Sequence, residues 1–285
     1  MTAPIDHVVE PRSGAVVALG AFDGVHRGHL ALVQDAAMRA RAAQQSLVAL
    51  VIDRADSARQ LTSVHRRCQL LVRAGVSSAS VVPFSRGERL TDRVSLAVRS
   101  LRPSAVLLDV ESMSVTDRRV VTSNLVGSGA TVEGFPAQSD PIHGPITSAA
   151  IVDHVRHGDV GVAFDLLGRP FELEGVIERT GGATGREPRW SFSSSDGSIV
   201  APGTGTYVAR VRTHRLWHGA ALVIGADDSR NELVITTPTL TSAESRPIPV
   251  EVGVVERWPQ NAGFGLDAMT DVLSEWAPRL RAFPR

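Results

Sequence analysis

The chain has 285 residues, of which 43% are hydrophobic. At roughly 100 to 200 residues per domain, this length predicts two domains, each with enough apolar side chains for a core. The composition excludes an intrinsically disordered chain and a disulfide-stabilised miniprotein. The 30 basic residues balance the 30 acidic ones, so no overall positive field favours nucleic acid or an anionic membrane. We therefore expect no nucleic-acid or membrane partner, and any phosphate site must be local.

Two residue types narrow the chemistry further. The sequence contains no lysine, which excludes a P-loop and Schiff-base catalysis. The single cysteine, Cys68, cannot form an internal disulfide, and no cluster of histidine, cysteine or carboxylate side chains predicts a protein metal site. Residues 1–10 lack the pattern of a signal peptide, and no apolar run reaches membrane-spanning length. These features favour a cytoplasmic protein.

The first half of the chain alternates short apolar runs with amphipathic segments. The predicted strands are Ala15–Leu19, Leu47–Ile52, Val81–Phe84, Ala105–Val110 and Ala130–Val132. A first helix is expected from Gly28 to about Gln44, and a second from Thr62 or Ser63 to the C-capping Gly75. This alternation predicts an α/β fold with a doubly wound, mostly parallel sheet.

The character of the chain changes after residue 140. Two short helices, Thr147–His157 and Asp159–Leu167, are expected as a helical connector. The β-rich segments that follow predict a small antiparallel β-barrel, and they are Phe171–Glu178, Tyr207–Arg212, Ala220–Ile224, Glu232–Thr236 and Pro249–Glu256. A C-terminal helix is expected over Leu266–Leu280. The predicted domains are residues 1–145 and 171–285, joined by the connector at 146–170.

The most informative segment directly follows the first strand, and it reads Gly-Ala-Phe-Asp-Gly-Val-His-Arg-Gly-His from Gly20 to His29. A His-x-Gly-His pair at a helix start brings two imidazoles and several backbone N–H groups to one point, where the helix dipole favours negative charge. Gly20 and Gly24 permit a tight strand-to-helix turn, and Gly28 lets phosphates approach the backbone. This arrangement suits a triphosphate.

The chemistry that fits this segment is nucleotidyl transfer. An acceptor oxygen would attack the α-phosphorus of a nucleoside triphosphate, while His26 and His29 stabilise negative charge on the phosphoryl oxygens. The competing interpretation is that both histidines are surface residues that cap the helix. The neighbouring Phe-Asp-Gly and the spacing of the glycines favour the functional interpretation.

The segment resembles the signature of the bacterial bifunctional riboflavin kinase/FAD synthetases. The resemblance extends over most of the chain, through Leu61-Thr62-Ser63, Ala74-Gly75-Val76, Pro145-Ile146-Thr147-Ser148 and Leu166-Leu167-Gly168-Arg169-Pro170-Phe171. It implies a nucleotidyltransferase domain and a riboflavin-kinase barrel, with ATP, Mg²⁺ and FMN as reactants and FAD as product. It implies catalysis by His26 and His29. It implies contacts to ATP and its phosphates from Gly20, Phe22, Asp23, Gly24, Gly28, Thr147 and Ser148.

The chain departs from the family at four places. The segments at residues 53–57, 108–114, 149–152 and 181–190 lack, in turn, the family's Phe-Asp-Pro-His-Pro run, its flavin-holding Gly-x-x-Phe-x-Phe-Gly, a phosphate-site arginine and its Gly-Phe-Pro-Thr-Ala-Asn motif. Asp109 and Glu111 are candidate flavin contacts because they follow the fourth strand at the carboxyl edge of the sheet. Glu232 is a candidate kinase base, although a surface strand glutamate is at least as plausible.

Three functional hypotheses follow. The first is an FMN adenylyltransferase that makes FAD and pyrophosphate from ATP and FMN, with a degenerate barrel that has lost riboflavin kinase activity. The second is a non-catalytic paralogue that binds a nucleotide, a flavin or a protein partner. The third keeps nucleotidyl transfer but changes the acceptor. The sequence leaves the oligomeric state open.

Overall fold

The computed structural model describes residues 14–54, 59–84, 88–125, 129–179, 189–213, 216–225, 232–235, 247–258, 271–272 and 274–275. The chain divides into two compact units, Met1–Ala58 with Thr62–Ser148 and Arg59–Leu61 with Ala149–Arg285. The first unit ends three residues beyond the predicted boundary at residue 145. Most of the predicted connector, from Ala149 onward, is grouped with the second unit.

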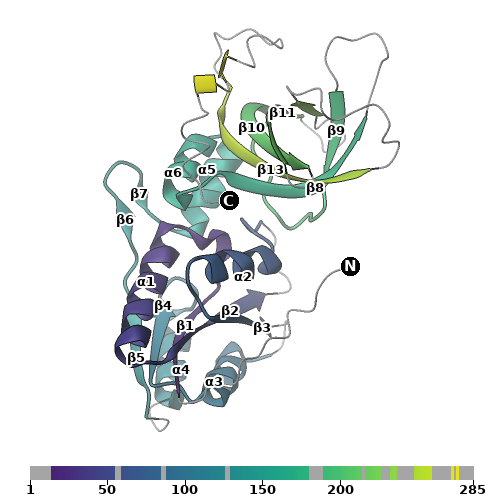
Figure 1. The fold of residues 1–285 in the computed structure, drawn as a ribbon. Helices are drawn as coiled ribbons and strands as arrows, with labels where there is room; N and C mark the ends of the chain where they lie inside the picture. Colours follow the sequence, from purple (N-terminus) through teal and green to yellow (C-terminus); the bar gives the residue numbers. More distant parts are fainter. Residues whose placement is uncertain are drawn as a thin grey trace. The chain divides into compact units, whose positions relative to one another are not determined.

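The first unit is built on a five-stranded sheet, and each pair of neighbouring strands is parallel. Its strand order is β3-β2-β1-β4-β5 (Figure 1). The strands are β1 (Ala15–Gly20), β2 (Ser46–Arg54), β3 (Ser78–Phe84), β4 (Ala105–Asp109) and β5 (Thr131–Phe135). The predicted doubly wound parallel sheet is thereby confirmed.

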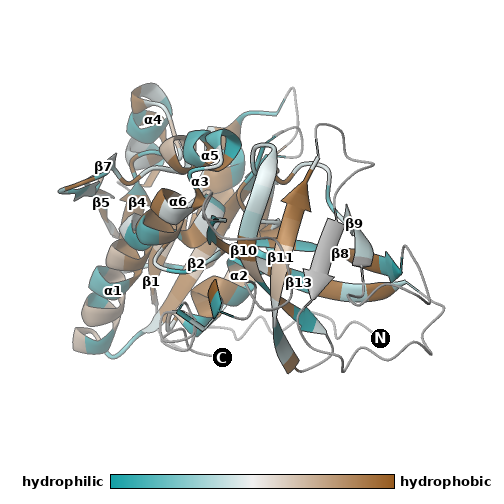
Figure 2. Ribbon diagram, turned by 90° about the horizontal axis from the view of Figure 1, so that it is seen from above, coloured by the Kyte–Doolittle hydropathy of each residue, from teal (hydrophilic) through white to brown (hydrophobic). Residues whose placement is uncertain are grey.

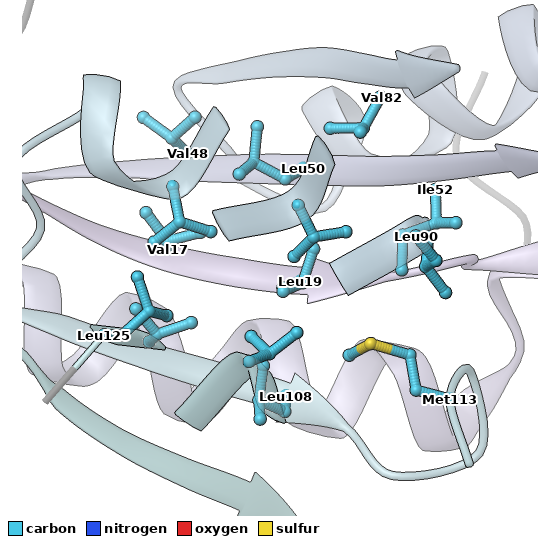
Figure 3. Close-up of a cluster of buried hydrophobic side chains, with 14 of the residues drawn as sticks. Val17, Leu19, Val48, Leu50, Ile52, Val82, Leu90, Leu108, Met113 and Leu125 are labelled. Carbon is cyan, nitrogen blue, oxygen red and sulfur yellow. The ribbon is translucent and has the colours of Figure 1, made fainter. Parts of the chain in front are cut away.

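Helices cover both faces of this sheet. They are α1 (Arg27–Ala42), α2 (Val64–Arg73), α3 (Leu90–Ser100) and α4 (Val115–Leu125). Side chains of α1 and α2 pack with Val16 and Ala18 of β1 on one face, and those of α3 and α4 pack with Val17 and Leu19 on the other. Figure 3 shows the second of these clusters. Because both faces are covered, all six residues of β1 are buried, as the continuous apolar run predicts.

The position of helix α1 on the sheet is explained by the spacing of its apolar residues. Leu32, Val33, Ala36 and Ala40 recur at helical spacing and are buried against the sheet. Polar and apolar bands alternate along this helix in Figure 2, as expected for a helix with one buried and one exposed side. Its buried side fixes the position of its first turn at the carboxyl end of β1.

The strand order reverses direction between β1 and β4. The chain moves from β1 outward to β2 and β3, and then returns to the other side of β1 to form β4 and β5. In open α/β sheets this switch point, outside the carboxyl ends of the two central strands, is where ligands bind. The Gly20–His29 segment follows β1, and the Asp109–Ser112 segment follows β4.

The second unit contains a closed antiparallel barrel, with strand order β10-β11-β12-β9-β8-β13. Its strands are β8 (Phe171–Arg179), β9 (Arg189–Ser194), β10 (Gly205–Thr213), β11 (Leu216–Ile224), β12 (Glu232–Ile235) and β13 (Ile248–Arg257). The predicted barrel is confirmed, but β9 was not expected. Its serines indicate a loop, whereas the buried Trp190 and Phe192 alternate as a strand requires.

Two helices precede the barrel in sequence, α5 (Ser148–His157) and α6 (Val160–Leu167), close to their predicted bounds. A short hairpin of β6 (Ser139–Asp140) and β7 (Gly144–Pro145) ends the first unit. The predicted helix over Leu266–Leu280 lies outside the described residues except at 271–272 and 274–275, which are helical. Among the helices of the described ranges, none has the length and apolarity that a membrane crossing requires.

The core of the first unit predicts a measurable stability difference. Leu50 on β2 is 2% exposed, so truncation in Leu50→Ala removes buried methyl groups and should cost about 2 to 5 kcal/mol. Leu96 on α3 is 69% exposed, and Leu96→Ala should change stability by less than about 0.5 kcal/mol. Urea unfolding followed by circular dichroism compares the two. Equal losses would contradict this description of the core.

Candidate functional site

The turn from β1 into α1 has a strongly constrained backbone. Phe22, Gly24 and Val25 all have positive φ, at 51°, 78° and 39°. Only glycine adopts such values without strain, so the surroundings must hold the two other residues in place. Phe22 is completely buried and its ring meets that of His29 edge to face, with centroids 5.3 Å apart. The turn is therefore fixed by packing before any ligand binds.

The two histidines predicted from the sequence lie together at the start of α1. His26 is the N-cap, and its Nδ1 accepts a hydrogen bond from the backbone N–H of His29 at 3.3 Å. The imidazole rings stack, with centroids 3.6 Å apart and an angle of 15° between their planes. They are only 4% and 3% exposed, so a phosphate could reach them only after the atoms that cover them shift.

Asp109, at the end of β4, joins this pair. Its Oδ2 lies 3.3 Å from Nε2 of His29 and accepts a hydrogen bond from the hydroxyl of Ser112, while its Oδ1 accepts one from the backbone N–H of Glu111 at 3.1 Å. Ser112 Oγ in turn accepts a bond from the backbone N–H of Ala21 at 2.7 Å. The loops after β1 and β4 are thereby joined at the switch point.

These bonds determine the charge of Asp109. Burial by itself raises the pKa of a carboxyl, but the hydrogen bond and the charge interaction with His29, with the bonds from Ser112 and the backbone of Glu111, outweigh it. The pKa of Asp109 is lowered from 3.8 to about 2. The site therefore holds a buried, ionised carboxylate at neutral pH.

Two glycines of the motif make room for this arrangement. A Cβ at Gly20 would lie 2.8 Å from Cβ of Asp109, and one at Gly28 would lie 3.1 Å from Nδ1 of His26. We expected Gly20 to permit the turn and Gly28 to admit phosphates. In the structure each glycine also lets a side chain of the site approach the backbone, and the expected roles stay predictions. Gly24, with its positive φ, does serve the turn as predicted.

Asp23 stabilises the turn between β1 and α1 through a buried network of hydrogen bonds and one ion pair. Its Oδ1 accepts a hydrogen bond from the backbone N–H of Thr62 at 3.1 Å and pairs with the guanidinium of Arg67 at 3.0 Å. Thr62 Oγ1 accepts a bond from the backbone N–H of Gly24 at 2.9 Å, and Arg67 also donates to the carbonyl of Ala21. Arg67 is 3% exposed, so this charge pair is largely shielded from solvent.

The end of the first unit contacts the same turn. Ser148 Oγ donates to the carbonyl of Asp23 at 2.9 Å, and Asp140 of the hairpin pairs with Arg27 of the motif at 2.8 Å. The carbonyl oxygen of Ile146 would lie 3.4 Å from a Cβ at Gly28. Thr147, which is half-buried, lies between Ile146 and Ser148. The predicted contribution of these hydroxyl residues to a phosphate site stays a prediction, while their proximity to the motif is plain.

Sequence reasoning missed three residues of this site. Ser112, Thr62 and Arg67 contact the motif from distant positions in the chain. Thr62 was noticed only as a possible helix cap, whereas Ser63 is the N-cap of α2. A charged Arg67 beside Cys68 on the buried side of a helix was an available signal, since such an arginine normally needs a buried partner.

The remaining candidates are less informative. Glu111 is exposed, and the pKa of its carboxyl is raised by partial burial and by the neighbouring charge of Asp109. Glu232 begins β12 of the barrel, paired with Val223 and Ser191. The segment at 180–188, where the family's kinase motif is missing, lies outside the described residues. Across the described ranges, no three metal-binding side chains gather in one place.

Comparison with known proteins assigns the first unit. Residues 9–91 match the family model of FAD synthetase. The matched segment includes the whole of Gly20–His29. Over 102 residues it is 33% identical to a Geobacillus thermodenitrificans protein named bifunctional riboflavin kinase/FMN adenylyltransferase. That match covers 33% of this chain and 57% of the relative, so the shared sequence is limited to part of each protein.

A solved structure resembles both units. The macrolide-efflux protein from Streptococcus pneumoniae has a TM-score of 0.70, with 96% of this chain and 95% of that chain covered at 22% identity. At this identity the likeness shows a shared fold. The FAD synthetase match, in contrast, covers the motif itself.

The close approach at Gly20 gives one prediction. In Gly20→Ala the new methyl group meets the side chain of Asp109 and must displace it, which should cost about 1 to 3 kcal/mol of stability. Gly197→Ala is the matched control, because no atom lies within 4 Å of a Cβ there. Urea unfolding of both variants measures the difference. Wild-type stability in Gly20→Ala would show that Asp109 does not need this space.

The low pKa of Asp109 predicts how stability depends on pH. Because the folded-state value of about 2 lies below the ordinary 3.8, the carboxylate stabilises the protein above about pH 4 and loses this effect as the pH falls towards 2. The shift corresponds to about 2 kcal/mol. Denaturant unfolding between pH 5 and pH 2 should therefore show a smaller loss for Asp109→Asn than for the wild type.

Asp35→Asn controls for the loss of one negative charge, because Asp35 pairs with Arg39 on the outer side of α1. It should keep the wild-type loss of stability between pH 5 and pH 2. Identical pH dependence of the free energy of unfolding in Asp109→Asn and wild type would mean that the Asp109 carboxylate does not stabilise the protein.

Proposed function

We propose that the chain is an FMN adenylyltransferase, which transfers AMP from ATP to FMN and releases pyrophosphate. The observation that carries the proposal is the stacked pair of His26 and His29 at the N-terminus of α1, at the switch point of the sheet and inside the segment that matches the FAD synthetase model. Fold, motif and family thus point to the same edge of the sheet.

The start of α1 suits the triphosphate of ATP. The first turn of a helix directs backbone N–H groups and the positive end of its dipole at a bound anion. Ser148 donates a hydrogen bond to this turn, and Asp140 of the hairpin forms an exposed ion pair with Arg27. Because exposed ion pairs contribute little, we expect this covering segment to shift when ATP binds.

The reaction needs positioning and charge stabilisation rather than a covalent intermediate. A phosphate oxygen of FMN attacks the α-phosphorus, a new P–O bond forms, and the bond to the pyrophosphate leaving group breaks. His26 and His29 stabilise the phosphoryl oxygens as negative charge builds on them. We expect Mg²⁺ to enter on the phosphates of ATP, which is how this ion is commonly bound at nucleotide sites.

For the second unit, we propose a riboflavin-kinase-like barrel that has lost kinase activity. The closed antiparallel barrel supports the relation in fold, and the absence of the family's Gly-Phe-Pro-Thr-Ala-Asn motif from the sequence supports the loss. The placement of Glu232 at the start of a barrel strand is compatible with a former kinase base.

A specific observation favours a second candidate, a nucleotidyltransferase with an acceptor other than FMN. The family's flavin-holding stretch is missing at residues 108–114, and both oxygens of Asp109 are engaged within the protein. Asp109 is therefore committed to His29 rather than turned towards an acceptor. Pyrophosphate release with phosphorylated acceptors other than FMN would identify this case.

The test is a chromatographic assay of the purified protein with ATP, Mg²⁺ and either FMN or riboflavin. We expect FAD from FMN and no product from riboflavin. His29→Ala and His29→Gln should lower the rate by about 100-fold or more, as is typical when a group that stabilises transition-state charge is removed. His65→Ala, which changes an exposed histidine on α2, should keep the wild-type rate.

Circular dichroism shows whether each variant is folded. Wild-type turnover in a folded His29 variant would contradict the proposed mechanism. If no FAD forms but pyrophosphate is released with another acceptor, that acceptor rather than FMN is the substrate. FMN formed from riboflavin would contradict the loss of kinase activity.

A further inference from the structure

Arg118 on α4 is a charged side chain that no described residue pairs with. It is part-buried, its Nε is buried, and among the described residues its guanidinium has no hydrogen bond and no ion pair. A guanidinium keeps its charge over the whole physiological pH range and can only donate hydrogen bonds. A buried donor without an acceptor is costly and needs an explanation. A ligand that brings oxygen atoms to Arg118 would provide one.

The position of Arg118 on α4 places it on the side of the helix that faces the sheet. The completely buried Val121 and Leu125 follow it at helical spacing on this side, whereas the adjacent Arg119 is exposed. Figure 3 shows Met113, just before α4, towards the carboxyl ends of the strands and Leu125, at the end of α4, towards their amino ends. Because helical side chains lean towards the N-terminus of their helix, we expect Arg118 to extend towards the carboxyl edge of the sheet.

At this edge the chain turns to both faces of the sheet. From β1 it continues into α1 on one face, and from β4 it continues into α4 on the other. In open α/β sheets a ligand binds between two such connections, outside the carboxyl ends of the two strands. His26 and His29 lie at the start of α1, and Arg118 ends the first turn of α4. A molecule bound at this edge can therefore meet the histidine pair at one end and Arg118 at the other.

The carboxylates closest to Arg118 in sequence are engaged with other groups. Asp117 accepts a hydrogen bond from the hydroxyl of Ser114 at 2.7 Å, and its backbone N–H donates to the same oxygen at 3.0 Å. Asp109 is held by His29 and Ser112. The donors of Arg118 are thus available to a ligand. A guanidinium is suited to a planar pair of oxygen atoms, to which it donates two parallel hydrogen bonds.

We propose that Arg118 is a specificity-determining residue, which binds the acceptor substrate through oxygen atoms at the end remote from the reacting phosphate. In FMN these are carbonyl oxygens of the flavin ring, and in another acceptor carbonyl or carboxylate oxygens take their place. The inference rests on the proposed function for the reaction at the histidine pair. It does not require that the acceptor is FMN.

Steady-state kinetics of FAD formation provides the first test. Arg118→Ala should raise the KM for FMN about tenfold or more, as expected when a charge-assisted hydrogen bond is lost, and should leave kcat and the KM for ATP unchanged. Arg118→Lys keeps the charge without the planar donor pair and should restore only part of the affinity. Arg119→Ala, which changes the exposed neighbour, should behave as the wild type. An unchanged KM for FMN in Arg118→Ala, or an equal rise of the KM for ATP, would overturn the proposal.

Binding followed by flavin fluorescence provides a second test, without turnover. FMN and riboflavin share the flavin ring, but riboflavin lacks the phosphate. Arg118→Gln, which keeps part of the aliphatic stem, should weaken the binding of both by the same factor, because the lost contact is to the ring. Circular dichroism shows whether the variant is folded. Weaker binding of FMN alone would place Arg118 at the phosphate and overturn the proposal.

The tests separate failure of this proposal from failure of the proposed function. If the wild type makes no FAD but releases pyrophosphate with another acceptor, a higher KM for that acceptor in Arg118→Ala would support the role of Arg118 and reject FMN. FAD formation by the wild type with an unchanged KM for FMN in Arg118→Ala would support the enzyme and reject the role of Arg118. A wild type that binds no flavin and releases pyrophosphate with no acceptor would reject both.

Discussion

The hydrogen bond between His29 and Asp109 joins two parts of the chain that lie 80 residues apart in sequence. It requires β4 to lie next to β1, and it requires α1 to start close to the carboxyl end of β1. It also requires a glycine at position 20, since a side chain there would occupy the space of Asp109. The arrangement of the candidate site depends on this one contact and on the sheet order that permits it.

The contact also determines the balance of charge at the switch point. An ionised carboxylate is costly to bury unless it is paired, and Asp109 is paired with a histidine, a hydroxyl and a backbone N–H. His29 joins this carboxylate to the start of α1, where His26 is the N-cap. The chain lacks lysine, and the nearby Arg67 is occupied by Asp23.

The strands and the histidine pair could be predicted from the sequence, whereas the partners of the histidines could not. The apolar runs predicted the strands, and the His-x-Gly-His spacing predicted that His26 and His29 would meet at a helix start, since both effects are local. The partnership of His29 with Asp109 depends on which strands are neighbours, which no local pattern reveals. The close approach of Asp109 to Gly20 could not be predicted, because it depends on tertiary packing, and the role of Gly28 in admitting phosphates stays a prediction. The strand β9 was missed because its serines indicate a loop, while its packing depends on Trp190 and Phe192.

We infer that the start of α1, at the carboxyl ends of β1 and β4, binds the triphosphate of ATP. A crystal structure of the full chain with Mg²⁺ and a non-hydrolysable ATP analogue tests it most directly. We predict phosphate density at the first turn of α1, within hydrogen-bonding distance of His29, with the segment at residues 138–148 displaced. Analogue bound elsewhere, with the stacked histidines still covered, would contradict the account.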